Sequence, residues 1–107
     1  MTFLAVDAQK NLFTMKKSQL QFEQTIIMNR ASMITKEMGD YSAAQGDNWD
    51  AEQDGYYISL QQTEEYLEST QDNLDSQIAL MDAQINSLKQ LVNNNIKNGA
   101  GLNLIGS

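Results

Sequence analysis

The chain has 107 residues, a formal net charge of −7, and no cysteine, histidine or proline. Without cysteine it has no disulfide bond and no thiolate chemistry, and without histidine it lacks the commonest general base and the commonest zinc ligand. Seven basic residues against fourteen acidic ones match the phosphate backbone poorly, so we expect no nucleic-acid partner. No apolar run approaches the ~20 residues of a transmembrane helix, so we expect no membrane span.

The first predicted helix covers about residues 7–38, which contain no glycine and no proline. Apolar residues recur every seven positions along it, and this spacing places them on one slowly drifting face that is expected to meet a second helix. We assign to the seam between the helices Phe13, Leu20, Ile27 and Ile34. Asp7 is predicted to cap this helix, and Gly39 to end it in the left-handed conformation.

A second apolar set on the same helix, here called the outer stripe, consists of Met15, Phe22, Ile26 and Met33. It lies more than ~100° around the helix from the seam face, so one partner helix cannot cover both. A contiguous apolar patch on a small protein usually marks a contact surface. The sequence therefore predicts an interface at the outer stripe, with a second copy or with another helical protein. One alternative is that a terminal segment, residues 1–6 or 100–107, folds over it. The other is that these methionines and the phenylalanine are tolerated as single exposed side chains.

The second predicted helix covers about residues 56–98, followed by a flexible tail at 99–107. The apolar residues of this second helix follow the alternating three- and four-residue steps of a coiled-coil seam. The seam residues on this helix are Leu67, Leu74, Ile78, Met81, Ile85 and Leu88. The pattern predicts an all-α, antiparallel two-helix hairpin, coiled-coil-like, forming a single domain over residues 1–107. Because so short a chain buries little core, we expect it to complete that core by oligomerisation or by docking on a partner.

The connector, about residues 39–55, is acidic and holds the only tryptophan, Trp49. Asp50, Glu52 and Asp54, followed by Gly55, resemble the first half of a calcium-binding EF-hand loop, although the second half is not matched. No metal and no cofactor is the main expectation, and a weak divalent-cation site on these three acids is one alternative.

A simpler explanation assigns these acids to the start of the second helix. Asp47 would then be its cap, with the following acids in the first turns, where the helix dipole favours negative charge. The other possibility is that the helix begins after Gly55 and that the acids lie in the loop.

A helical hairpin of about a hundred residues with tryptophan in its turn resembles the Trp-x-Gly family of small proteins exported by specialised bacterial secretion systems. Here the motif reads Trp49-Asp50-Ala51, without the glycine. The resemblance implies a helical hairpin dimer that is exported, and composition is similar to that of needle and filament subunits. A bacterial secretion substrate or filament subunit is therefore another alternative.

The main functional prediction is a non-enzymatic structural or protein-interaction module. A hairpin supplies no enclosing cleft for paired carboxylates, and a di-iron bundle would need histidines. The first residues lack the pattern of a cleaved signal peptide, so we expect a cytoplasmic protein or one exported without such a peptide.

Overall fold

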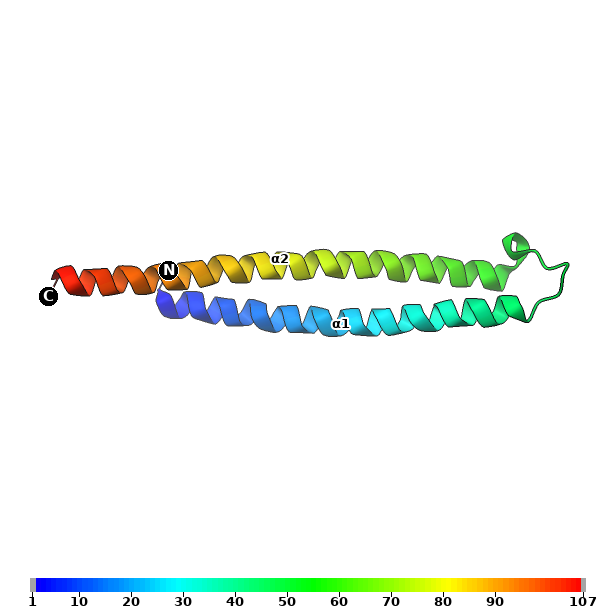
Figure 1. Ribbon diagram of the computed structural model, residues 1–107, viewed down its shortest axis with the longest axis horizontal. Helices are drawn as coiled ribbons and strands as arrows, with labels where there is room; N and C mark the ends of the chain where they lie inside the picture. Colours follow the sequence, from blue (N-terminus) through cyan, green and yellow to red (C-terminus); the bar gives the residue numbers. More distant parts are fainter. Residues whose placement is uncertain (1, 107) are drawn as a thin grey trace. The chain divides into compact units, whose positions relative to one another are not determined.

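The computed structural model describes the backbone of residues 2–106 and the side-chain surroundings of residue 2 and residues 4–94. Helix α1 spans Phe3–Ala43 and helix α2 spans Gly55–Gly106, with the short 3₁₀ helix η1 at Ala51–Gln53 between them (Figure 1). The two long helices pack antiparallel, so the predicted all-α hairpin is confirmed. The chain divides into two compact units: unit 1 comprises Met1–Gln21 with Ser76–Ser107, and unit 2 comprises Phe22–Asp75.

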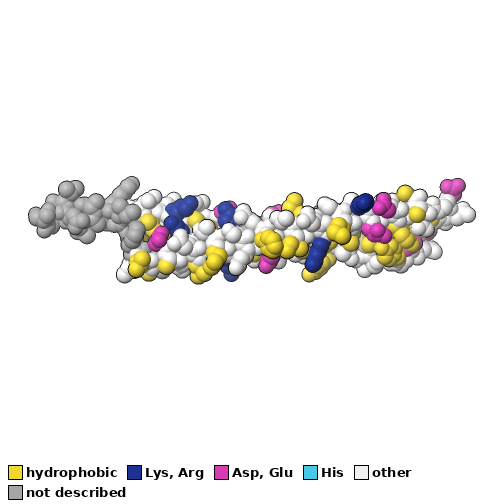
Figure 2. Space-filling view, turned by 90° about the horizontal axis from the view of Figure 1, so that it is seen from below, with side chains coloured by type: hydrophobic (Ala, Val, Ile, Leu, Met, Phe, Trp, Pro, Cys, Tyr) yellow, Lys and Arg dark blue, Asp and Glu magenta, His cyan; other side chains and the backbone are white. Residues whose placement is uncertain are grey.

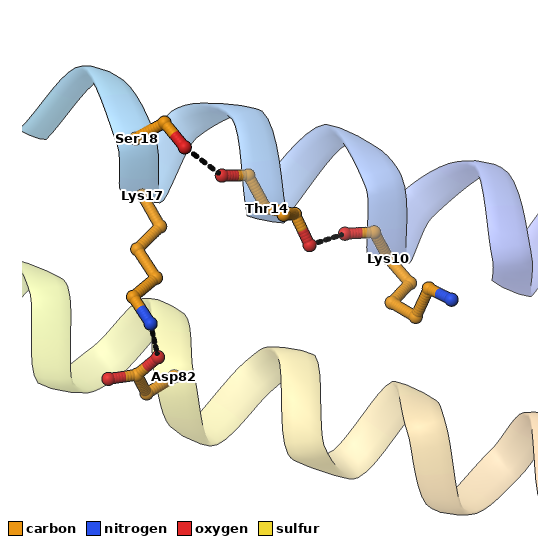
Figure 3. Close-up of polar contacts among 5 residues, drawn as sticks. All are labelled: Lys10, Thr14, Lys17, Ser18 and Asp82. Carbon is orange, nitrogen blue, oxygen red and sulfur yellow. Dashed lines mark hydrogen bonds and ion pairs between the residues drawn. The ribbon is translucent and has the colours of Figure 1, made fainter.

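In unit 1 the core lies between the first part of α1 and the last part of α2. Among the side chains of this unit that the structure describes, those buried are Val6, Leu20, Met81, Ile85 and Leu88. Lys17 Nζ of α1 lies 2.5 Å from Asp82 Oδ1 of α2, an ion pair that joins the two helices (Figure 3). Both charged groups are partly exposed, so the pair contributes at most ~1 kcal/mol, and the apolar contacts dominate the stability of this unit.

In unit 2 the buried side chains all come from α2 and are Leu60, Leu67 and Leu74. Two hydrogen bonds fix the antiparallel register: Gln24 Nε2 donates to Asp75 Oδ1, and Thr35 Oγ1 donates to Glu64 Oε2 at 3.2 Å. From the first bond to the second, the chain advances by eleven residues on α1 and retreats by eleven on α2. The two helices therefore keep one register through this unit, as a coiled-coil seam requires.

The two helices contribute unequally to the core. The predicted seam residues of α2 are buried except for Ile78, which is half-buried, whereas on α1 Leu20 is buried and Phe13, Ile27 and Ile34 are half-buried. A hairpin covers each helix on one side only, so side chains at the margin of the seam keep part of their surface in water. Among the described helices, none is long and apolar enough to cross a membrane.

Helix α1 begins earlier than predicted. Thr2 is its cap, because the Thr2 Oγ1 accepts a hydrogen bond from the Ala5 N–H at 3.2 Å. Asp7, predicted to be the cap, lies in the first turns of the helix, where its carboxylate pairs with Lys10 Nζ at 3.1 Å. Residues 3–6 belong to α1, so the alternative in which residues 1–6 fold over the outer stripe is wrong.

Helix α1 also ends later than predicted, since it continues through Gly39 to Ala43. No described glycine has positive φ, so Gly39 does not take the predicted left-handed conformation. The carbonyl groups of the last turn are satisfied instead by the Ala44 N–H, which donates to the Asp40 carbonyl, and by Gln45 Nε2, which donates to the Tyr41 carbonyl at 3.0 Å. Glycine inside a helix costs only ~1 kcal/mol, so it can be accommodated there.

Helix α2 starts at Gly55 and continues through Gly106, past the end predicted at Asn98. The start agrees with the second of the two possibilities, in which the acids lie in the connector. The flexibility of residues 99–107 stays a prediction, and their side chains lie outside the described residues, as does any packing of residues 100–107 on the outer stripe.

Candidate functional site: exposed apolar surfaces of the two units

All four residues of the outer stripe are exposed. Met15, in unit 1, is 55% exposed, and in unit 2 Phe22 is 68%, Ile26 37% and Met33 69% exposed. Figure 2 shows apolar side chains at the surface, interspersed with charged ones. Each Å² of apolar surface left in water forgoes ~25 cal/mol of burial free energy. Burial of the outer stripe against a partner would therefore be favourable in free energy.

Beside Met33, the surface of unit 2 forms a groove of about 290 Å³ between α1 and α2. The groove is lined by Arg30, Met33 and Ile34 of α1 and by Thr63, Tyr66 and Leu67 of α2. Arg30 adds a positive charge to a mainly apolar lining. Such a groove can receive an apolar side chain of a docked helix, with the guanidinium placed for an acceptor on the same helix.

Tyr66 is the residue of this surface that the sequence did not indicate. It is 70% exposed and widens the apolar surface from α1 onto α2. A usable signal was present, because Tyr66 directly precedes the seam residue Leu67 and a large ring at that position flanks the seam. Tyrosine is also enriched at protein interfaces, where it combines apolar area with a polar hydroxyl.

Unit 2 has another surface away from the outer stripe. A groove of about 490 Å³ is lined by Met28, Ala31, Ser32, Thr35, Lys36 and Gln71. Most of these residues are polar or small, and Met28, 49% exposed, is its large apolar side chain. This surface offers less apolar area than the groove at Met33, so the outer stripe remains the better candidate for docking.

Unit 1 has a groove of its own, of about 320 Å³. Phe13 and Leu88 supply its apolar lining, and Gln9, Ala83, Gln84 and Ser87 complete it. Within the described residues the Gln84 Oε1 is buried and has no hydrogen-bond partner. A buried acceptor without a donor costs ~1–3 kcal/mol.

Asp54 organises the connector. Its Oδ2 accepts hydrogen bonds from the Tyr41 hydroxyl at 2.6 Å and from Trp49 Nε1 at 2.9 Å, while its Oδ1 accepts one from the Tyr57 N–H at 2.9 Å. The last bond caps α2, so the cap is Asp54 and not Asp47 as predicted. The ring centroids of Tyr41 and Trp49 lie 6.1 Å apart, and those of Trp49 and Tyr57 5.1 Å, so the three rings pack edge to face or stack around this carboxylate.

These contacts change the acidity of the groups involved. The Tyr41 hydroxyl, with the Tyr57 N–H and the Trp49 indole, lowers the pKa of Asp54, because all three stabilise the carboxylate. The same hydrogen bond raises the pKa of Tyr41, since an ionised tyrosine could no longer donate to Asp54. The pKa of Tyr56 is raised in the same way by its hydrogen bond to Glu37, 2.9 Å long.

Two acids of the connector, Asp50 and Asp54, cap helices. Asp50 Oδ1 accepts from the Glu52 N–H at 3.0 Å and so caps η1, while Asp54 caps α2. Within the part of the chain that the structure describes, no group of three or more histidine, cysteine, aspartate or glutamate side chains is placed to hold a metal ion. The structure thus does not bring Asp50, Glu52 and Asp54 together as ligands.

Comparison with known proteins gives no match: no protein-family model matches the sequence, and neither a curated protein nor a solved structure matches it. The resemblance to the Trp-x-Gly family therefore remains one of length, hairpin form and tryptophan placement.

Proposed function

We propose that this protein is a non-enzymatic interaction module, a helical hairpin that completes its core by self-association or by docking on another helical protein. The contact surface is the outer stripe of Met15, Phe22, Ile26 and Met33, joined in unit 2 by the groove that Tyr66 borders.

The observation that carries the proposal is the exposure of Phe22 and Met33, about two thirds of whose surface is open to water at 68% and 69%. Single exposed apolar residues are ordinary on protein surfaces, but these share a helix face with Ile26 and border an apolar groove. In addition, the described side chains of α1 include only two that are buried and apolar, Val6 and Leu20. Much of α1 thus lacks the covering that a stable small domain needs.

A non-enzymatic role is supported by the shape and content of the surfaces. The described grooves are open and are lined by no cluster of acidic, basic and nucleophilic groups of the kind that catalysis requires. The one set of hydrogen-bonded titratable groups in the connector, around Asp54, stabilises a helix start.

Sedimentation of the whole chain at high micromolar concentration, together with binding of an apolar dye, tests this proposal. We expect either concentration-dependent association or a monomer that binds the dye strongly. A compact monomer that binds no dye would contradict it, because the outer stripe would then have no surface available for a partner.

A further inference from the structure

The two units carry charge of opposite sign. By sequence, unit 1 has five basic and two acidic residues, a net charge of +3, and unit 2 has two basic and twelve acidic residues, a net charge of −10. At ~0.1 M salt the Debye length is ~10 Å, so a docked surface responds to the charge of the unit it touches more than to the net charge of the chain.

Both units also expose large apolar side chains that a partner could cover. In unit 1 these are Leu4, Leu12, Met15, Leu80 and Leu91, and in unit 2 Phe22, Ile26, Met33, Tyr56 and Tyr66. The charges beside the outer stripe differ between the units: the exposed Lys16 follows Met15 in unit 1, and the exposed Glu23 follows Phe22 in unit 2. Both units contain charges of both signs, and Arg30 also borders the groove of unit 2, but the net charge beside the apolar area is positive in unit 1 and negative in unit 2.

We propose that the partner is a second copy of this chain, with unit 1 of one copy docked on unit 2 of the other. The proposal rests on the interaction function proposed above and specifies its partner. Contacts between like units would set −10 against −10 or +3 against +3, whereas contacts between unlike units set +3 against −10. Electrostatics acts mainly on orientation and specificity, so the apolar surfaces supply the affinity and the charges select the pairing of unlike units.

The polar groups at the grooves agree with this pairing. The groove of unit 1 is lined by the side-chain amides of Gln9 and Gln84, and unit 2 exposes Tyr66, whose hydroxyl can donate to an amide carbonyl. Conversely, the Arg30 guanidinium in the groove of unit 2 is a donor that can bind acceptors such as the side-chain carbonyl groups of unit 1.

Two matched double variants test the pairing. Lys16→Gln with Lys89→Gln lowers the charge of unit 1 from +3 to +1, and Gln61→Glu with Gln62→Glu changes unit 2 from −10 to −12. Both variants have the same net charge, −9, and all four side chains are exposed in the structure. Dissociation constants are measured by sedimentation equilibrium in ~0.1 M salt, with circular dichroism to establish that each variant is helical.

We expect the lysine variant to dissociate with a roughly tenfold larger Kd, and the glutamate variant to bind as tightly as the wild type or more tightly. Equal weakening of both would overturn the proposal, because it would mean that only net charge matters. An unchanged Kd in the lysine variant would also overturn it. If the wild type stays monomeric but binds apolar dye, the second copy is wrong and the interaction function stands with another partner; a monomer that binds no dye removes both.

Discussion

Replacement of Phe22 by serine tests the outer stripe directly. Phe22 is 68% exposed, and an aromatic side chain buries ~150–250 Å² when covered, so about 140 Å² remains available for a partner. At ~25 cal/mol per Å² this surface contributes about 3.5 kcal/mol if it is fully covered. Allowing for incomplete coverage, we expect Phe22→Ser to weaken association by about 2–3 kcal/mol, a roughly 30- to 150-fold increase in Kd.

The same substitution should leave the isolated chain almost unchanged. Because Phe22 contributes little to the core of unit 2, dilution to a monomer should bring the unfolding free energies of variant and wild type within ~0.5 kcal/mol of each other. Met28→Ser is the matched control, since Met28 is also largely exposed on α1 but lies outside the outer stripe, and its Kd should stay close to that of the wild type. The reasoning is refuted if both variants weaken association equally, or if Phe22→Ser has no effect on an associating protein.

Three further predictions concern the fold. Gly39→Ala should stabilise the protein by ~0.5–1 kcal/mol in urea unfolding, because Gly39 lies inside α1 with open space around its missing side chain; destabilisation would mean that it takes a left-handed conformation after all. Leu67→Ala should lower the free energy of unfolding by ~2 kcal/mol, which is near the low end for a buried leucine because Leu67 borders an open groove. The control is Leu80→Ala at an exposed position, which should change that free energy by less than ~0.5 kcal/mol. Asp54→Asn should lower the thermal midpoint near neutral pH, because the Asp54 carboxylate accepts the hydrogen bonds of the connector. The pKa of Asp54 in the folded protein lies below its ordinary 3.8, so the stability advantage of the wild type should be complete above pH 3.8 and disappear as the pH falls through the lower, folded value. A constant difference in midpoint down to strongly acidic pH would contradict the carboxylate's role.

The fold could be predicted because its main determinant is periodic. Apolar residues seven positions apart define a helix face whatever the rest of the protein does, and Leu67, Leu74, Met81 and Leu88 follow that spacing on α2 and are all buried. The outer stripe follows from the same geometry, since residues that do not share the seam face must lie elsewhere on the helix. Its exposure agrees with this, and its role as an interface remains a prediction.

The ends of the elements were harder to predict because they depend on contacts between distant residues. Several acids in the connector can cap a helix, and the choice of Asp54 is determined by Tyr41, thirteen residues earlier, and by the Trp49 indole. A local pattern contains neither contact. The prediction for Gly39 is wrong for a related reason. Glycine after a turn with basic and acidic residues is typical of a helix end, but here the helix continues to Ala43, and Gln45 Nε2 donates to the Tyr41 carbonyl beyond Gly39.

The hydrogen bond between Trp49 and Asp54 determines which part of the protein its intrinsic fluorescence reports on. Trp49 is the only tryptophan, its indole donates to a carboxylate in the connector, and the Tyr57 ring lies 5.1 Å away, where it can transfer excitation energy to the indole. The emission is thus a local optical probe of the connector in unit 2, while far-ultraviolet circular dichroism averages over both helices. If the fluorescence and the circular dichroism give different unfolding midpoints, the connector opens at a different denaturant concentration from the two paired helices.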